Sequence, residues 1–224
     1  MTPQNPVQQA VAVFRKDLRM ELRNRGSLNA ILLFSVISLI VMAFGVGNLE
    51  IIAHLKAGLL WVVLFFAAFS GLSHVFVQEE ETGTSLALKM HARPESVYAG
   101  KAAFNLVLTF GIAVIVVPIF VIMLKLPTEK PIALAAVIIS GLFALSSGAS
   151  AVAAIISQSR GKGAIFGAIG FPILLPALMV GVRATQIAVT SSDESVVRTV
   201  FGLVAFGVMI TTVAAALFPI LWDD

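Results

Sequence analysis

The sequence predicts an all-α integral membrane protein, with six transmembrane helices preceded by an amphipathic helix at the membrane interface. Of the 224 residues, 58% are hydrophobic and only 12% are charged, whereas a soluble domain carries about 25% charged residues. The apolar residues also gather in runs of about 18 or more, which are long enough to cross a bilayer as helices. A transmembrane β-barrel would need alternating strands of about ten residues, and the sequence has no such pattern.

The helix before the first span is predicted over residues 6–26. Asn5-Pro6 is typical of a helix start, and Gly26 of a helix end. Apolar residues recur between them at intervals of three and four: Val7, Val11, Phe14, Leu18 and Leu22. Basic residues occupy the rest of the circumference: Arg15, Lys16, Arg19 and Arg23. Such a helix suits the interface of an anionic leaflet. The alternative is a basic flank that only orients the first span.

Six apolar stretches follow, and each is expected to form one span. They are residues 28–47, 57–77, 102–124, 132–157, 164–182 and 197–221. Backbone polar groups in lipid must be hydrogen-bonded within their own segment, which favours helices. We therefore predict a single membrane domain over residues 1–224, with the six-span bundle at 28–222. The connection at 183–196 is partly apolar, which leaves two alternatives: a solvated connector and a segment that re-enters the membrane.

The fourth stretch carries a face of small residues, which would let a neighbouring helix approach closely. Its members are Ser140, Gly141, Ala144, Ser147, Gly148 and Ala151. Packing within the bundle and contact with another subunit both fit this face.

The placement of basic residues predicts the orientation. With a cytoplasmic N-terminus and six spans, both termini are cytoplasmic. The inner segments then hold ten basic residues: Arg15, Lys16, Arg19, Arg23, Arg25, Lys89, Arg93, Lys101, Arg160 and Lys162. The outer segments hold five: Lys56, Lys125, Lys130, Arg183 and Arg198. This excess follows the positive-inside rule. The basic residues are thus attributed to topology and contact with the lipid membrane, and no nucleic-acid partner is expected.

The sequence offers little chemistry for an enzyme. It has no cysteine, and its three histidines, His54, His74 and His91, fall at different predicted depths. No Asp lies within a predicted span, and Glu50 sits at the edge of the first. We expect no catalytic residue, no metal site and no directly bound cofactor. A Walker A sequence is also missing, so any ATP hydrolysis is expected in a separate subunit.

A polar island at residues 78–101 separates the second and third stretches. Three acids follow the second stretch directly, Gly83 permits a turn, Thr84 can cap a short helix, and Pro94 would stop it. This loop is the candidate for docking and coupling an ATPase, through Glu79, Glu80, Glu81, Gly83, Thr84, Leu86, Leu88, Arg93, Pro94 and Glu95. The alternative is a solvated, charged loop.

Three segments resemble the haem exporter protein B family, CcmB. They are F-R-K-D-L-R-M-E-L-R-N-R at 14–25, G-L-L-W at 58–61, and E-E-E-T-G-T with R-P-E-S and G-K within 79–101. The resemblance extends over essentially the whole chain. It implies a permease subunit of the c-type cytochrome maturation transporter, with the six-span fold of ABC exporter permeases. The coupling segment would then be residues 79–96, and the interfacial helix residues 6–25.

The resemblance also implies partners and a location. The partners are a CcmA-like ATPase that binds ATP, a CcmC-like membrane subunit that handles haem, a small CcmD-like helper and a CcmE-like haem chaperone. ATP hydrolysis would be coupled to release of the haem-loaded chaperone, with haem as the candidate cargo. The location implied is the bacterial cytoplasmic (inner) membrane. Two alternatives stay open: an ABC permease for a lipid, drug or polysaccharide, and a membrane scaffold that transports nothing.

Overall fold

The computed structural model describes residues 5–23, 26–47, 49–81, 92–156, 162–190 and 195–223. Within these ranges, side chains are not described at 27, 70–81, 162–168, 221 and 223. Seven α-helices account for most of the described residues: α1 Pro6–Arg23, α2 Gly26–Val46, α3 Ala53–Glu81, α5 Pro94–Met123, α6 Pro131–Ile156, α7 Lys162–Val189 and α8 Val196–Asp223.

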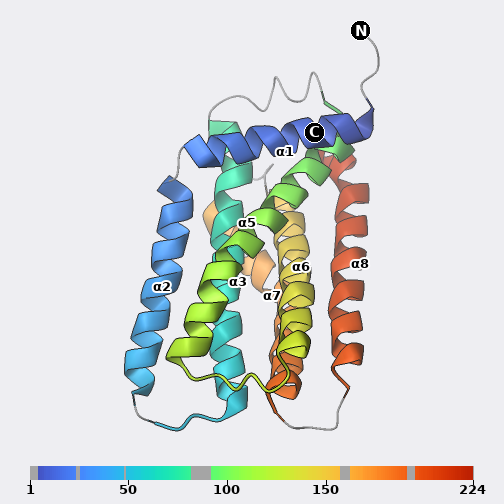
Figure 1. Ribbon diagram of the computed structural model, residues 1–224. Helices are drawn as coiled ribbons and strands as arrows, with labels where there is room; N and C mark the ends of the chain where they lie inside the picture. The colour runs from blue at the N-terminus through green and yellow to red at the C-terminus, as the bar shows by residue number, and fades with distance from the viewer. Residues whose placement is uncertain are drawn as a thin grey trace.

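Helices α2, α3, α5, α6, α7 and α8 stand side by side and alternate in direction, while α1 lies across one end of the bundle (Figure 1). The C-terminal end of α8 lies at the same end, which we call the α1 end. The end of α2 and the start of α3, the connection from α5 to α6, and the end of α7 and the start of α8 lie at the opposite end. At the opposite end, Gly47 after α2 has a φ of +54°, a conformation that glycine adopts without strain.

The helices identify an all-α membrane protein. Five of them contain stretches long and apolar enough to cross a bilayer: 28–46, 94–123, 131–156, 169–189 and 196–220. In α3 the apolar stretch among residues with described side chains is Ala53–Phe69, and the helix itself continues to Glu81. Large apolar side chains such as Phe44, Ile122 and Ile132 are more than three-quarters exposed, as expected where lipid replaces water as solvent.

Helix α6 occupies the centre of the bundle, where it packs against α3, α5, α7 and α8. Two-thirds of its apolar stretch is buried, against 17% in α2 and in α8. All six members of the predicted small-residue face are buried. Gly148 approaches Leu174 of α7, where an added Cβ would lie 2.4 Å from the leucine Cδ2. The small residues therefore serve packing within the bundle.

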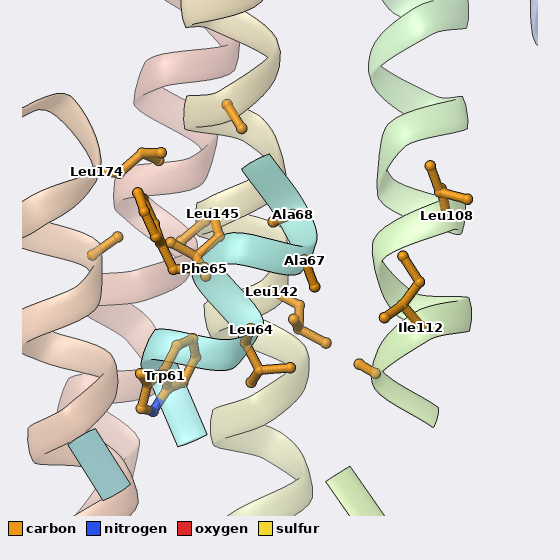
Figure 2. Packing of buried hydrophobic residues seen from close by; sticks show 14 of the residues in the cluster. Trp61, Leu64, Phe65, Ala67, Ala68, Leu108, Ile112, Leu142, Leu145 and Leu174 are labelled. Carbon is orange, nitrogen blue, oxygen red and sulfur yellow. The ribbon is translucent and has the colours of Figure 1, made fainter. Parts of the chain in front are cut away.

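Trp61 of α3 fills the space between two glycines. Its ring lies against Gly141 of α6 and Gly181 of α7, and Cβ atoms there would lie 1.9 and 2.8 Å from the ring. The indole Nε1 donates a 2.8 Å hydrogen bond to the buried Thr185 hydroxyl. Figure 2 shows the ring among Leu64, Leu142 and other core residues. One large side chain thus joins three helices and satisfies its own polar atom, as buried tryptophan requires.

Three predicted boundaries were wrong. Gly26 does not close the first helix: α1 ends at Arg23, and Gly26 begins α2. The third span does not begin near residue 102, because α5 already begins at Pro94. The segment from Arg183 to Val189 is neither connector nor re-entrant loop, because it continues α7. Its apolar side chains Ile187, Ala188 and Val189 are buried in the bundle, which explains the partly apolar sequence.

Candidate coupling site at the α1 end

The predicted coupling loop joins α3 to α5 at the α1 end of the bundle. Glu79, Glu80 and Glu81 form the end of α3, but their side chains are among those not described. Gly83, Thr84, Leu86 and Leu88, together with the predicted short helix, lie outside the described residues. Arg93, Pro94 and Glu95 are described, and they open α5. The two described ends of the loop therefore belong to the end of α3 and the start of α5.

Pro94 starts α5. Arg93 has extended backbone angles, with φ of −72° and ψ of 138°, and Pro94 follows within the first turn. Proline is well suited to this position because its fixed φ matches the helix and its missing N–H is not needed there. Glu95 lies in the same turn, where its negative charge is favourable at the positive end of the helix dipole. Arg93 and Glu95 are both exposed, so they remain available for contact with a partner.

The first two turns of α5 are held against α1 by polar contacts. The Ser96 hydroxyl donates a 3.0 Å hydrogen bond to the Pro6 carbonyl, and the Arg93 backbone N–H donates a 3.2 Å bond to Gln9 Oε1. The helices approach so closely at Gly100 that an added Cβ would lie 2.7 Å from the Ala10 carbonyl oxygen. Any motion of the start of α5 must therefore move α1 or break these contacts.

A buried ion pair lies at the centre of this contact. Lys101 of α5 and Asp17 of α1 are 1% and 6% exposed, and Lys101 Nζ lies 3.8 Å from Asp17 Oδ2. The other carboxylate oxygen lies 3.1 Å from Lys16 Nζ. Sequence reasoning missed the pair, because Lys101 counted only as a topology signal and Asp17 had no assigned role. The available signal was Asp17 itself, one of only two acids in this basic helix, the other being Glu21.

The surface of α1 divides into three regions. Val13 and Asp17 are buried against the bundle, and Phe14 and Leu18 pack partly against the core. Val7, Val11 and Leu22 are exposed. Arg15, Arg19 and Arg23 are exposed as well, while Lys16 is only half-buried beside Asp17. The helix thus presents uncovered apolar and cationic side chains at the end of the bundle.

An aromatic cluster connects α8 to the same site. Tyr98 of α5 is buried and its ring centroid lies 5.6 Å from that of Phe218, which in turn lies 5.1 Å from Trp222. These aromatic pairs lie within the range of favourable ring contacts. The start of α5 is therefore fixed on one side to α1 and on another to the end of α8.

The described contacts at the α1 end are hydrogen bonds, an ion pair and aromatic packing between helices. Among residues with described side chains, no group of three His, Cys, Asp or Glu could hold a metal ion. His54 lies at the opposite end, where its ring Nδ1 is 3.0 Å from Gln186 Oε1. His74 has no described side chain, and His91 lies outside the described residues. What the α1 end offers is a junction of α1, α5 and α8 beside the end of α3.

Comparison with known proteins identifies relatives of the chain. The family described as CcmB protein matches residues 8–220. Heme exporter protein B of Rhodobacter capsulatus is 29% identical over 178 residues, which cover 78% of this chain and 81% of the relative. The protein of the same name from Bradyrhizobium diazoefficiens is 28% identical, over 78% of this chain and 80% of the relative. That of Paracoccus denitrificans is 28% identical over 81% and 84%.

Proposed function

Because this chain belongs to the CcmB family, we propose that it is the permease subunit of an ABC-type haem exporter that serves cytochrome c maturation. The observation that carries the proposal is the family match across nearly the whole chain, joined to a bundle of membrane helices. The curated relatives are named as haem exporter proteins. The family match covers both α1 and the connection between α3 and α5, the two features on which the mechanism below depends.

The proposed topology has six spans and places the α1 end in the cytoplasm of the bacterial inner membrane. Helix α3 is added to the five apolar helices as a further span, because its apolar stretch Ala53–Phe69 continues as helix to Glu81. Cytoplasmic placement puts the exposed Arg15, Arg19 and Arg23 at the anionic inner leaflet. The exposed Val7, Val11 and Leu22 would enter the interface beside the bundle, as in interfacial helices. Helix α1 would then lie in the membrane surface.

The proposed mechanism transmits the motion of a separate ATPase through the loop between α3 and α5. A CcmA-like subunit would bind and hydrolyse ATP and dock on residues 79–96. Movement of that loop would displace the start of α5. There, Ser96 and Lys101 connect α5 to α1, and Tyr98 connects it to α8. The junction would thus move as one unit and rearrange the opposite end. A CcmC-like subunit would handle haem, with a small CcmD-like helper beside it, and ATP hydrolysis would be coupled to release of a haem-loaded CcmE-like chaperone.

Charge reversal of the acids at the end of α3 tests the docking role. Replacing Glu79, Glu80 and Glu81 together with lysine adds charge that the positive-inside rule favours on this side, so membrane insertion is expected to persist. ATPase association, measured by cross-linking in membranes, is expected to be lost. Neutral variants show whether the position of the acids matters or only the total charge of the protein. E79Q/E80Q/E81Q should weaken association, whereas E50Q/E129Q at the opposite end should not. Normal association in the lysine variant would remove the docking role.

A further inference from the structure

A groove opens between α7 and α8 at the opposite end of the bundle. Its volume is about 760 Å³, and its lining includes Arg183, Ile187, Val197, Arg198, Thr199 and Phe201. The two arginines come from different helices, and both are exposed. Ile187 is buried at the base, whereas Val197 and Phe201 are about three-quarters exposed. The groove thus combines two guanidinium groups with an apolar floor and rim.

A second, apolar groove of about 510 Å³ lies on the other side of α8, toward α6. Its lining includes Ile132, Ala136, Val197 and Val200, with Lys130 at its border. Val197 belongs to both linings, so the two grooves meet at the first turn of α8. Around that turn, a cationic region and an apolar region are therefore adjacent.

We propose that these joined grooves bind one anionic phospholipid, with its phosphate between Arg183 and Arg198 and an acyl chain along Ile132, Ala136 and Val200. The position favours this occupant, because α6 and α8 begin, and α7 ends, at the level where headgroups meet the ends of spans. Guanidinium groups match phosphate geometry through paired N–H donors. A free phosphate would make no contact with the apolar groove, whereas an acyl chain would, and this favours a lipid over a free anion.

The electrostatics also favour a negative headgroup over a zwitterionic one. The first turn of α8 contains no acidic residue, and a helix N-terminus carries partial positive charge. A choline group would place a third positive charge beside two arginines. Arg183 has an interaction of its own within the chain, yet a guanidinium has five N–H donors, so one contact leaves others for a phosphate.

The test is native mass spectrometry of the intact protein after delipidation in mild detergent. Phosphatidylglycerol and phosphatidylcholine are added back separately, and the fraction retaining one lipid is measured. The wild type is expected to retain phosphatidylglycerol more tightly. In R183Q/R198Q that retention should weaken about tenfold or more, because two charge-assisted contacts are lost. R183K/R198K should fall between them, because lysine keeps the charge but not the paired donors.

The matched control removes two other cations at the same end, in K56Q/K125Q, and is expected to retain lipid normally. Equal loss in the control would overturn the proposal, because it would indicate a general surface charge effect. Unchanged retention in R183Q/R198Q would also overturn it, and would point to the chain's own Asp193 and Glu194 as the partners of these arginines. The two acids lie outside the described residues. The result of this test does not depend on ATPase docking, because the substitutions change only the opposite end of the bundle.

Discussion

The ion pair between Asp17 and Lys101 predicts how strongly α1 is fixed to the bundle. Both side chains are almost fully buried, and removing one partner of a buried ion pair costs about 3–5 kcal/mol. Asp17→Asn removes the carboxylate beside Lys101, so a cost near the lower end of that range is expected. Lys101→Met should cost less than Asp17→Asn, because Lys16 still lies 3.1 Å from the carboxylate. The double variant D17N/K101M should regain most of the loss, since no buried charge then stays unpaired.

Cysteine labelling measures this loosening directly, because the natural chain contains no cysteine. Val13 is 5% exposed, and it packs against Gly100 at the α1–α5 contact. V13C should therefore react with a membrane-impermeant maleimide only when α1 detaches. If α1 opens locally before it reacts, 3 kcal/mol corresponds to about a hundredfold faster labelling.

The order expected is D17N fastest, then K101M, with the double variant close to the parent. V7C, which is exposed in the wild type, serves as the control and should label rapidly in every background. Equal labelling of V13C in the D17N and parent backgrounds would refute the reasoning, because the ion pair would then contribute nothing to the position of α1.

Two further predictions concern the packing of the bundle. Gly141→Ala should destabilise the protein by about 1–3 kcal/mol through overpacking, because the new Cβ would lie 1.9 Å from the Trp61 ring; thermal unfolding in detergent measures this, and adding Trp61→Phe should relieve it. If G141A is as stable as the wild type, the ring is not wedged between α6 and α7. Asn105→Leu should remove the amide bonds to Ser146 and Ser150 of α6 and lower stability by about 1 kcal/mol; an unchanged melting temperature would indicate that this buried amide does not join α5 to α6.

The sequence predicted the membrane class well, because the solvent determines it. Lipid requires long apolar segments, and such runs are visible without any knowledge of contacts. The small-residue face of α6 was also visible, since small residues at helical spacing have one common use in membranes. Which side chain fills that face was not predictable. The match between Trp61 and Gly141 joins residues 80 positions apart, and no local pattern in the sequence connects them.

The α1 end was harder to predict, because polar side chains were expected to be exposed. Ser96 and Lys101 are polar, so the segment before residue 102 was assigned to a loop, yet both are buried against α1. Burial is tolerated here because the Ser96 hydroxyl bonds to Pro6 and Lys101 lies beside Asp17. Similarly, because Arg183, Thr185 and Gln186 are polar, the sequence predicted that this span ends at residue 182, whereas α7 continues to Val189. The roles assigned to the acids at residues 79–81 stay predictions.

The most direct test of the proposed function is purification of the tagged protein from native membranes in mild detergent, with mass spectrometry of the proteins that accompany it. The expected result is an ABC-type ATPase together with cytochrome c maturation proteins. An ATPase without those proteins would contradict the haem-export assignment and favour a permease for another cargo. A stable, correctly inserted protein that recovers no ATPase would contradict the central claim and favour a scaffold that transports nothing.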